Sequence, residues 1–357
     1  MALPGSQFAY RAGLLGTALL VSRLSAALAA ATLPLDTPLP DAVPPGTELT
    51  VGATTATGIA LKLSGEFDKL PFKLKIANIT GGPESIAAFN GRALDLAGSA
   101  DIPPIQAEFI GLDARIVAVR FRQDQTVPTY QFGIAAKAGI ATLADLRGKR
   151  IAFSPGQAQG SVVVRTLKQF GIDQKEVQLI ELPATGNAYL NALAANLVDA
   201  APLAGIQVKR YVDQYGADGA KILVPDGVKD NPTNLWALTE TLQNPAKAAA
   251  IRLYIAAWAR ASRWEDTHRA VWIEAAYVKD QGVSPEDARF IDQTLGKADI
   301  PANWAGAIES EQETIDLMAA ETRHKPFPAA QLFDRRFETI AGQAYAAAEP
   351  EITGAGQ

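Results

Sequence analysis

The sequence contains no cysteine and only two histidines among 357 residues. Without cysteine the chain forms no disulfide, thiolate metal site, iron–sulfur cluster or cysteine nucleophile. It also lacks the cysteine to which bacterial lipoproteins attach their lipid. His268 and His324 lie apart in charge-rich, helical segments, and two isolated ligands cannot fill a tetrahedral metal site. We therefore expect no metal and no cofactor, with both histidines as polar surface residues.

The sequence also has no run of basic residues. Its 33 Lys and Arg are outnumbered by 38 Asp and Glu, for a net charge of −5, and its nearest basic cluster, Arg335-Arg336, is flanked by Asp334 and Glu338. Phosphate contacts require clustered Lys and Arg, so we expect no nucleic-acid partner. A chain of this length exceeds what one hydrophobic core normally supports, which predicts two domains.

The first residues have the pattern of an export signal. Arg11 precedes an apolar run over 12–21, small residues follow at 27–29 in an A-x-A arrangement, and the first thirty residues contain no acid. The run is too short to span a bilayer, so we interpret 1–31 as a secretory signal peptide and 32–47 as a Pro-rich leader. The expected location is periplasmic or secreted.

Residues 48–130 are predicted to form β-loop-α units. Apolar segments at 48–52, 72–77, 94–98 and 116–121 alternate with short helical patterns, which indicates a mostly parallel sheet. Ligands of such sheets bind beyond the carboxyl ends of the strands, where helix N-termini favour anions. The candidate ligand-binding residues in these loops are Thr55, Thr57, Gly58, Gly81, Gly82, Ser99 and Asp101.

A second α/β region follows over 131–230. Strands are expected at 131–135, 151–153, 177–182 and 219–224, and a polar loop at 154–161 leads into a helix expected over 162–170. The glycine spacing does not match a nucleotide-binding fingerprint, so we interpret the loop as a further anion-binding edge. The candidates on this side are Gly156, Gln157, Gln159, Gly160, Ser161, Thr185 and Asn187.

From residue 244 onward the pattern becomes helical, with helices expected at 245–264, 267–281, 285–295 and 310–321. The order of two α/β regions and a helical return predicts a discontinuous first domain. We interpret Trp258, Trp264 and Trp272 as core residues.

Two segments carry a family resemblance. Residues 98–105 (GSADIPPI) resemble the G-x-x-D-I-P-P motif of aliphatic-sulfonate-binding proteins of ABC importers, and 142–153 (TLADLRGKRIAF) resemble their T-x-x-D-L-K-G-K-x-V-A-F segment. The resemblance extends over about 48–345. The D-L-[KR]-G-K part is common to many type II periplasmic binding proteins, whereas the D-I-P-P part is typical of the sulfonate, nitrate and taurine group.

The resemblance implies an α/β, two-lobed type II clamshell, in which each lobe is a mostly parallel sheet flanked by helices, with a helical C-terminal region. Lobe I would comprise 48–130 and 231–345, lobe II 131–230, and 346–357 a tail. It further implies a non-catalytic monomer that binds a small sulfonate-like anion between its lobes and docks on an ABC transporter permease. Ser99, Asp101 and residues 156–161 would lie at the binding edges.

One departure leaves the ligand open. Relatives often carry W-x-P where this chain has Ala200-Ala201-Pro202, so a large aromatic is missing there, and Gln207 or Lys209 are candidates to compensate. The alternatives are a nitrate-, taurine- or bicarbonate-binding protein of the same fold, or a binding protein or synthase-like enzyme for a thiamine pyrimidine precursor. Desulfinases of this fold use a cysteine that is absent here. Since a carboxylate would repel the anion, we expect Asp101 to cap backbone amides instead.

Overall fold

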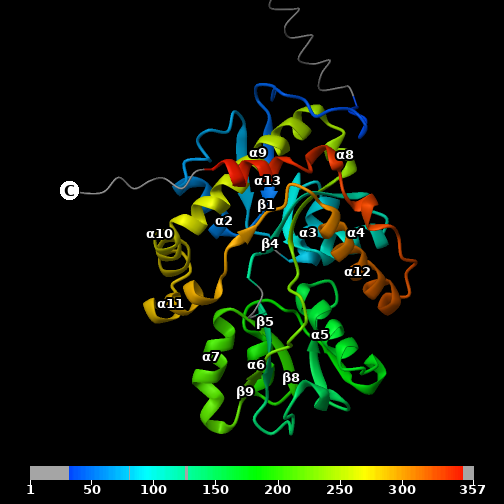
Figure 1. The fold of residues 1–357 in the computed structure, drawn as a ribbon, viewed down its shortest axis with the longest axis vertical. Coiled ribbons are helices and arrows are strands. Elements are labelled where there is room, and N and C mark those ends of the chain that lie inside the picture. The colour runs from blue at the N-terminus through cyan, green and yellow to red at the C-terminus, as the bar shows by residue number, and fades with distance from the viewer. Residues whose placement is uncertain (1–31, 80, 125–127, 349–357) are drawn as a thin grey trace, which may run out of the picture.

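The computed structural model describes residues 32–79, 81–124 and 128–348 as two α/β lobes. The expected signal peptide and residues 349–357 of the expected tail lie outside these ranges. In Figure 1 the blue-to-cyan and the yellow-to-red parts of the chain form one lobe, and the green middle part forms the other. We call these lobe I and lobe II.

Lobe I contains a six-stranded sheet in the order β11-β4-β10-β3-β1-β2. β1 pairs in parallel with β2 and β3, whereas β10 runs antiparallel to β3 and β4. The strands are β1 (Glu48–Gly52), β2 (Lys73–Ala77), β3 (Leu96–Ala100), β4 (Ala114–Arg122), β10 (Thr233–Leu238) and β11 (Ala298–Asp299). β10 was not expected from the sequence, and β3 lies two residues later than predicted.

Lobe II contains a five-stranded sheet in the order β7-β6-β8-β5-β9. β6 is parallel to β7 and β8, and β5 is antiparallel to β8 and β9. The strands are β5 (Tyr130–Ile134), β6 (Arg150–Phe153), β7 (Gln178–Glu181), β8 (Ala200–Ala204) and β9 (Lys221–Leu223). Each lobe has its own cluster of buried apolar side chains, so each sheet packs around a separate core.

Helices cover both sheets and connect their strands. In lobe I they are α2 (Thr55–Leu63), α3 (Gly82–Asn90), α4 (Ile102–Phe109), α8 (Thr239–Leu242), α9 (Pro245–Thr267), α10 (Arg269–Ile273), the π-helix η4 (Glu274–Lys279), α11 (Pro285–Thr294), α12 (Ala305–Thr322) and α13 (Ile340–Ala347), with the 3₁₀ turns η5 (Ala329–Leu332) and η6 (Arg335–Phe337). α9 begins where Asn244 accepts hydrogen bonds from the N–H groups of Ala246 and Lys247, with Pro245 in its first turn.

In lobe II the helices are α5 (Ala158–Gln169), α6 (Ala188–Ala194) and α7 (Ile206–Tyr215), with the 3₁₀ turns η1 (Leu143–Leu146), η2 (Gln174–Glu176) and η3 (Gly216–Asp218). α5 begins four residues earlier than predicted, so part of the expected polar loop forms its first turn. Within the part of the chain that the structure describes, no helix is long and apolar enough to cross a membrane.

The chain crosses between the lobes twice, after β4 and after β9. Asp230 ties the two crossings together: its carboxylate accepts from Arg122 Nε and Nη2 at 3.0 and 2.7 Å and from Thr129 N and Oγ1 at 2.7 and 2.8 Å. These bonds fix the junction from which the cleft between the lobes opens.

The Pro-rich segment before β1 packs on lobe I. Leu35, Leu39 and Val43 are partly buried against the lobe I core, and Leu33 N donates to Gln243 O at 2.7 Å. The segment thus adds to the lobe I surface.

Candidate functional site

A cavity of about 470 Å³ lies at the carboxyl-terminal edge of the lobe I sheet, beside the two crossings. The ends of β3 and β4 and the start of α2 form one side, and α9, α10 and η4 form another. Ala158, at the start of α5, contributes from lobe II. Both lobes therefore contribute to the cavity, at the edge where open α/β sheets bind ligands.

Arg120, near the end of β4, is the most loosely held of the three arginines in the cavity wall, which Lys297 also lines. Its Nη1 lies 3.5 Å from Glu265 Oε2 and 3.4 Å from Ser262 Oγ, and its guanidinium lies 5.7 Å from the centre of the Trp258 ring. These contacts are long for a group with five donors. The guanidinium retains donors for an oxyanion.

Two other arginines in the wall are held more closely. Arg122 forms short bonds with Asp230, and Arg269 donates from both Nη atoms to Gly296 O at 2.7 Å. Their guanidinium groups fix the chain rather than face a solute. Arg120 thus differs from both.

Glu265 is the carboxylate that opposes Arg120. Burial raises its pKa to about 7, with Asp266 adding to the rise, while Arg120 and Arg269 counteract it. Near neutral pH the Glu265 carboxyl group is therefore partly protonated, and a small change of pH changes the net charge beside Arg120.

The start of α2 adds neutral donors. Thr54 caps the helix by accepting from Thr57 N at 3.2 Å, and both threonines line the cavity. Thr55 instead donates to Asp280 Oδ2 at 2.6 Å, and Gly58 faces Ile76 under the helix. Of the three candidates in this loop, Thr55, Thr57 and Gly58, only Thr57 lines the cavity.

Ser99 also lines the cavity, but its hydroxyl is already engaged. Trp236 Nε1 donates to Ser99 Oγ at 2.9 Å, and this oxygen donates to Ala100 O at 2.9 Å. Ser99 therefore faces the cavity mainly with its backbone atoms.

Asp101 does not cap backbone amides, contrary to the expectation from the sequence. Its fully buried carboxylate accepts from Arg165 Nη2 at 3.2 Å, Thr314 Oγ1 at 2.9 Å and Asn231 Nδ2 at 2.5 Å. Arg165 belongs to α5 of lobe II, so Asp101 joins the lobes. The physical reason is its backbone: Asp101 has φ −66° and ψ −31°, a helical conformation rather than the extended one typical of a capping residue.

The predicted loop of lobe II is largely bonded within itself. Gln157 Oε1 accepts from Ser154 Oγ and Ala184 N, Gln159 Nε2 lies 3.5 Å from Ala184 O, and Ser161 Oγ donates to Ala158 O. Gly156, Gly160 and Ser161 line a separate cavity of about 130 Å³ against α4 and α12.

Two glycines mark where the lobes touch. A Cβ on Gly82 would lie 2.5 Å from Gly156 O, and one on Gly156, which has φ +84°, would lie 2.4 Å from Gln106 Oε1. Gly82 and Gly156 thus allow backbone contact between the lobes, whereas a Cβ on Gly81 would meet Glu84. These glycines lie outside the wall of the large cavity.

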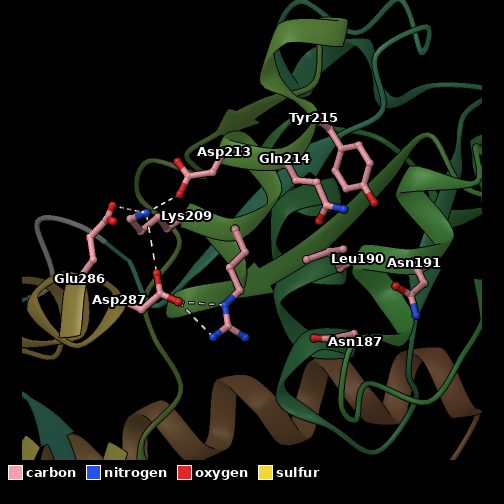
Figure 2. Close-up of a pocket in the computed structure, with 10 residues that line it drawn as sticks. Asn187, Leu190, Asn191, Lys209, Asp213, Gln214, Tyr215, Glu286 and Asp287 are labelled. Atoms are coloured by element: carbon pink, nitrogen blue, oxygen red, sulfur yellow. Dashed lines mark hydrogen bonds and ion pairs between the residues drawn. The ribbon is translucent and has the colours of Figure 1, made fainter. Parts of the chain in front are cut away.

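The remaining candidates lie in lobe II, outside the wall of the cavity around Arg120. Gln207 Nε2 donates to Gly186 O at 2.5 Å, Thr185 O accepts from Ala188 N, and Asn187 lines a surface cavity between α6, α7 and α11. This surface cavity, shown in Figure 2, is separate from the cavity around Arg120.

Ion pairs across the same region connect the lobes. Lys209 pairs with Asp213 on its own helix and with Glu286 Oε1 at 3.0 Å, and Arg210 Nη2 lies 3.0 Å from Asp287 Oδ2 (Figure 2). α7 belongs to lobe II and α11 to lobe I. The side chain of Lys209 therefore takes part in the contact between the lobes.

The sequence analysis missed the residues that give the cavity its character, namely Arg120, Tyr130, Trp258, Glu265, Trp272 and Tyr277. For Arg120 a signal existed. Strand residues two apart share a face, and basic residues at 120 and 122 end a strand whose middle, 116–119, is apolar. The helical contributors gave no comparable signal, because they meet the sheet only through the fold.

Two α/β lobes, two crossings and a cavity at the sheet edge define the fold of the periplasmic binding proteins. The chain matches the family described as NMT1/THI5 like over residues 114–251. It is 27% identical over 247 residues, 69% of this chain and 74% of the relative, to a provisionally named aliphatic sulfonates-binding protein of Escherichia coli (strain K12).

Two solved structures share the fold. The alkanesulfonate-binding protein SsuA from Xanthomonas axonopodis pv. citri, bound to MOPS, aligns with a TM-score of 0.65 at 22% identity, covering 85% of this chain and 98% of that one. The periplasmic aliphatic sulphonate binding protein SsuA from Escherichia coli gives a TM-score of 0.64 at 23% identity, covering 80% and 91%. These matches confirm the predicted two-lobed α/β fold and the resemblance on which the prediction rested.

Proposed function

We propose that this protein is the extracytoplasmic solute-binding component of an ABC importer, and that it binds a sulfonate-like organic oxyanion for delivery to a membrane permease. The observation that carries the proposal is Arg120, a loosely held guanidinium in the wall of a 470 Å³ cavity between two lobes. The similarity to aliphatic sulfonate-binding proteins supports the ligand class.

The chemistry of the wall suits such an anion. A sulfonate remains ionised at every working pH, and a guanidinium can donate to two of its oxygens. The start of α2 adds unpaired N–H groups and the positive end of the helix dipole.

A non-catalytic role fits the side chains at hand. Catalysis needs a nucleophile or base with an orienting partner. The chain has no cysteine, and its two histidines stack on aromatic rings away from the cavity: His268 on Trp264 and His324 on Phe109. The cavity wall instead combines a cation, donors and aromatic rings, which suits binding.

A thermal-shift screen of the purified full chain tests the ligand class. The panel comprises alkanesulfonates, taurine, nitrate, sulfate, bicarbonate and pyrimidines. A ligand at 100 times its Kd adds about 2.7 kcal/mol to the free energy of unfolding. The proposal predicts that a sulfonate raises Tm. A rise with pyrimidines and with no anion would favour the thiamine-precursor alternative instead.

A further inference from the structure

The cavity wall beside Arg120 is aromatic. Trp258 of α9, Trp272 of α10 and Tyr277 of η4 line it together with Tyr254. Trp258 and Trp272 are 5% and 6% exposed and also belong to the lobe I core. The interpretation of these tryptophans as core residues is therefore incomplete, since the same rings face the cavity.

These rings are positioned by the helical return. Trp272 and Tyr277 pack edge to face, with centroids 5.4 Å apart and planes at 89°. Tyr277 lies in the π-helical turn η4, and such turns are frequent at functional sites. These rings all come from lobe I, and Tyr130 of β5 adds one ring from lobe II to the cavity wall.

Two buried polar atoms in this wall have no partner among the residues that the structure describes. They are Tyr254 Oη and Trp272 Nε1. A buried donor without an acceptor costs about 1–3 kcal/mol, and such a cost is commonly retained where a ligand satisfies it. The two atoms therefore indicate where polar atoms of a ligand would lie.

The size of the cavity also indicates an organic ligand. About 470 Å³ falls in the range of sites for organic ligands, and far exceeds the space of an inorganic anion. An oxyanion bound to Arg120 would place its substituent near Trp258, because the guanidinium lies over that ring.

We propose that the solute is an aromatic oxyanion, an aryl sulfonate or a close analogue, whose ring lies against Trp258, Trp272 and Tyr277 while its anionic group binds Arg120. A hydrogen-bonding substituent on the ring satisfies Trp272 Nε1 and Tyr254 Oη. This inference rests on the proposed function and names the class of its ligand.

Calorimetric titration of the full chain with benzenesulfonate and hexanesulfonate tests it, since the two share charge and carbon number but differ in aromaticity. We expect benzenesulfonate to bind about tenfold more tightly, because aromatic pairs add about 0.5–1.5 kcal/mol each beyond their burial. We also expect 4-hydroxybenzenesulfonate to bind more tightly than benzenesulfonate.

Tyr277→Leu and Trp258→Phe locate the effect. We expect Tyr277→Leu to bring the Kd ratio of the two sulfonates close to one, because it removes a ring that contacts the aromatic ligand. Tyr215→Leu, in lobe II and outside the wall of the cavity around Arg120, is the matched control and should change neither Kd. Trp258→Phe keeps a ring at the cavity wall and should retain part of the preference. It is chosen because removing the whole ring at this buried site would destabilise lobe I.

Equal Kd values for benzenesulfonate and hexanesulfonate, or a preference that survives Tyr277→Leu unchanged, would overturn the inference and leave the proposed function standing. Binding of neither sulfonate would overturn both.

Discussion

At the scale of single residues, the cavity is governed by the pair Arg120 and Glu265. Their closest atoms are 3.5 Å apart, and the carboxyl group has a pKa raised to about 7 by burial. An ionised Glu265 competes with a solute for Arg120 and repels an anion. Protonation removes both effects, so the cavity should accept anions more readily at lower pH.

We predict that sulfonate affinity rises as the pH falls from 8 to 6. The other groups facing Glu265 are Asp266, Arg269 and Tyr277. Because Glu265 passes from mostly ionised to mostly neutral over this range, the Kd should fall by up to about tenfold. Calorimetry at several pH values measures this.

The matched variant is Glu265→Gln, which should bind tightly throughout and show a flat profile. A native profile that is itself flat, or in which sulfonate affinity falls as the pH falls, would contradict this role for Glu265.

At the scale of elements, α5 has two roles. It packs in the core of lobe II, and it also connects lobe II to lobe I. Its first turn contains residues that the sequence placed in a loop, and its Arg165 reaches the buried Asp101 at the start of α4. Thr314 of α12 completes this cluster by bonding both partners. The contact between lobes thus depends on a buried ion pair.

Asp101→Asn is predicted to lower the free energy of unfolding by about 3 kcal/mol. Removing one partner leaves Arg165 largely buried without a counter-charge, which is the costly case for such pairs. Chemical unfolding in urea measures the loss, with Asp68→Asn at an exposed site as control. Unchanged stability of Asp101→Asn would show that the pair contributes nothing net.

The elements also show what the sequence could predict. Segments with a clear period and cap, such as α9 and α11, lie close to where they were expected. β10 was missed because the loop before it has no alternating apolar pattern that would predict a strand. It also pairs only with strands that are far away in sequence. α5 was placed late because Gly160 and Ser161 favour a loop by composition, whereas in the structure both lie in the first turns of the helix, with Gly160 close against the Ser154 carbonyl oxygen.

The site was harder to predict than the fold. Loop composition pointed to Thr57 and Ser99, which do line the cavity. It could not show that Gln157 and Ser161 are already bonded within lobe II, since those partners depend on folding. Nor could it bring Trp258 beside Arg120, which lie 138 positions apart and meet only across the sheet edge.

At the scale of the whole molecule, the two lobes meet in a closed arrangement with contacts on both sides of the cleft. Gly82 touches Gly156 on one side, and Lys209 and Arg210 pair with Glu286 and Asp287 on the other. In Figure 1 α11 lies near α7, and α12 near α5, so the helical return contacts lobe II at two places. Solute binding should therefore be coupled to lobe contact.

Asp287→Asn is predicted to weaken sulfonate binding by about two- to fivefold without changing the cavity. The outer ion pairs are partly exposed, and each contributes up to about 1 kcal/mol to closure. The difference from native should shrink in high salt, which screens such pairs. Asp316→Asn on α12 is the control, and equal affinities for native and Asp287→Asn would show that these pairs do not assist closure.

The central claim is that Arg120 holds a sulfonate-like oxyanion between the lobes, and calorimetry of Arg120→Gln against native tests it most directly. The account predicts a loss of about 10- to 100-fold in sulfonate affinity, as expected when a charged hydrogen-bond partner is removed, with Arg289→Gln on exposed α11 unchanged. Native-like affinity in a folded Arg120→Gln would contradict it.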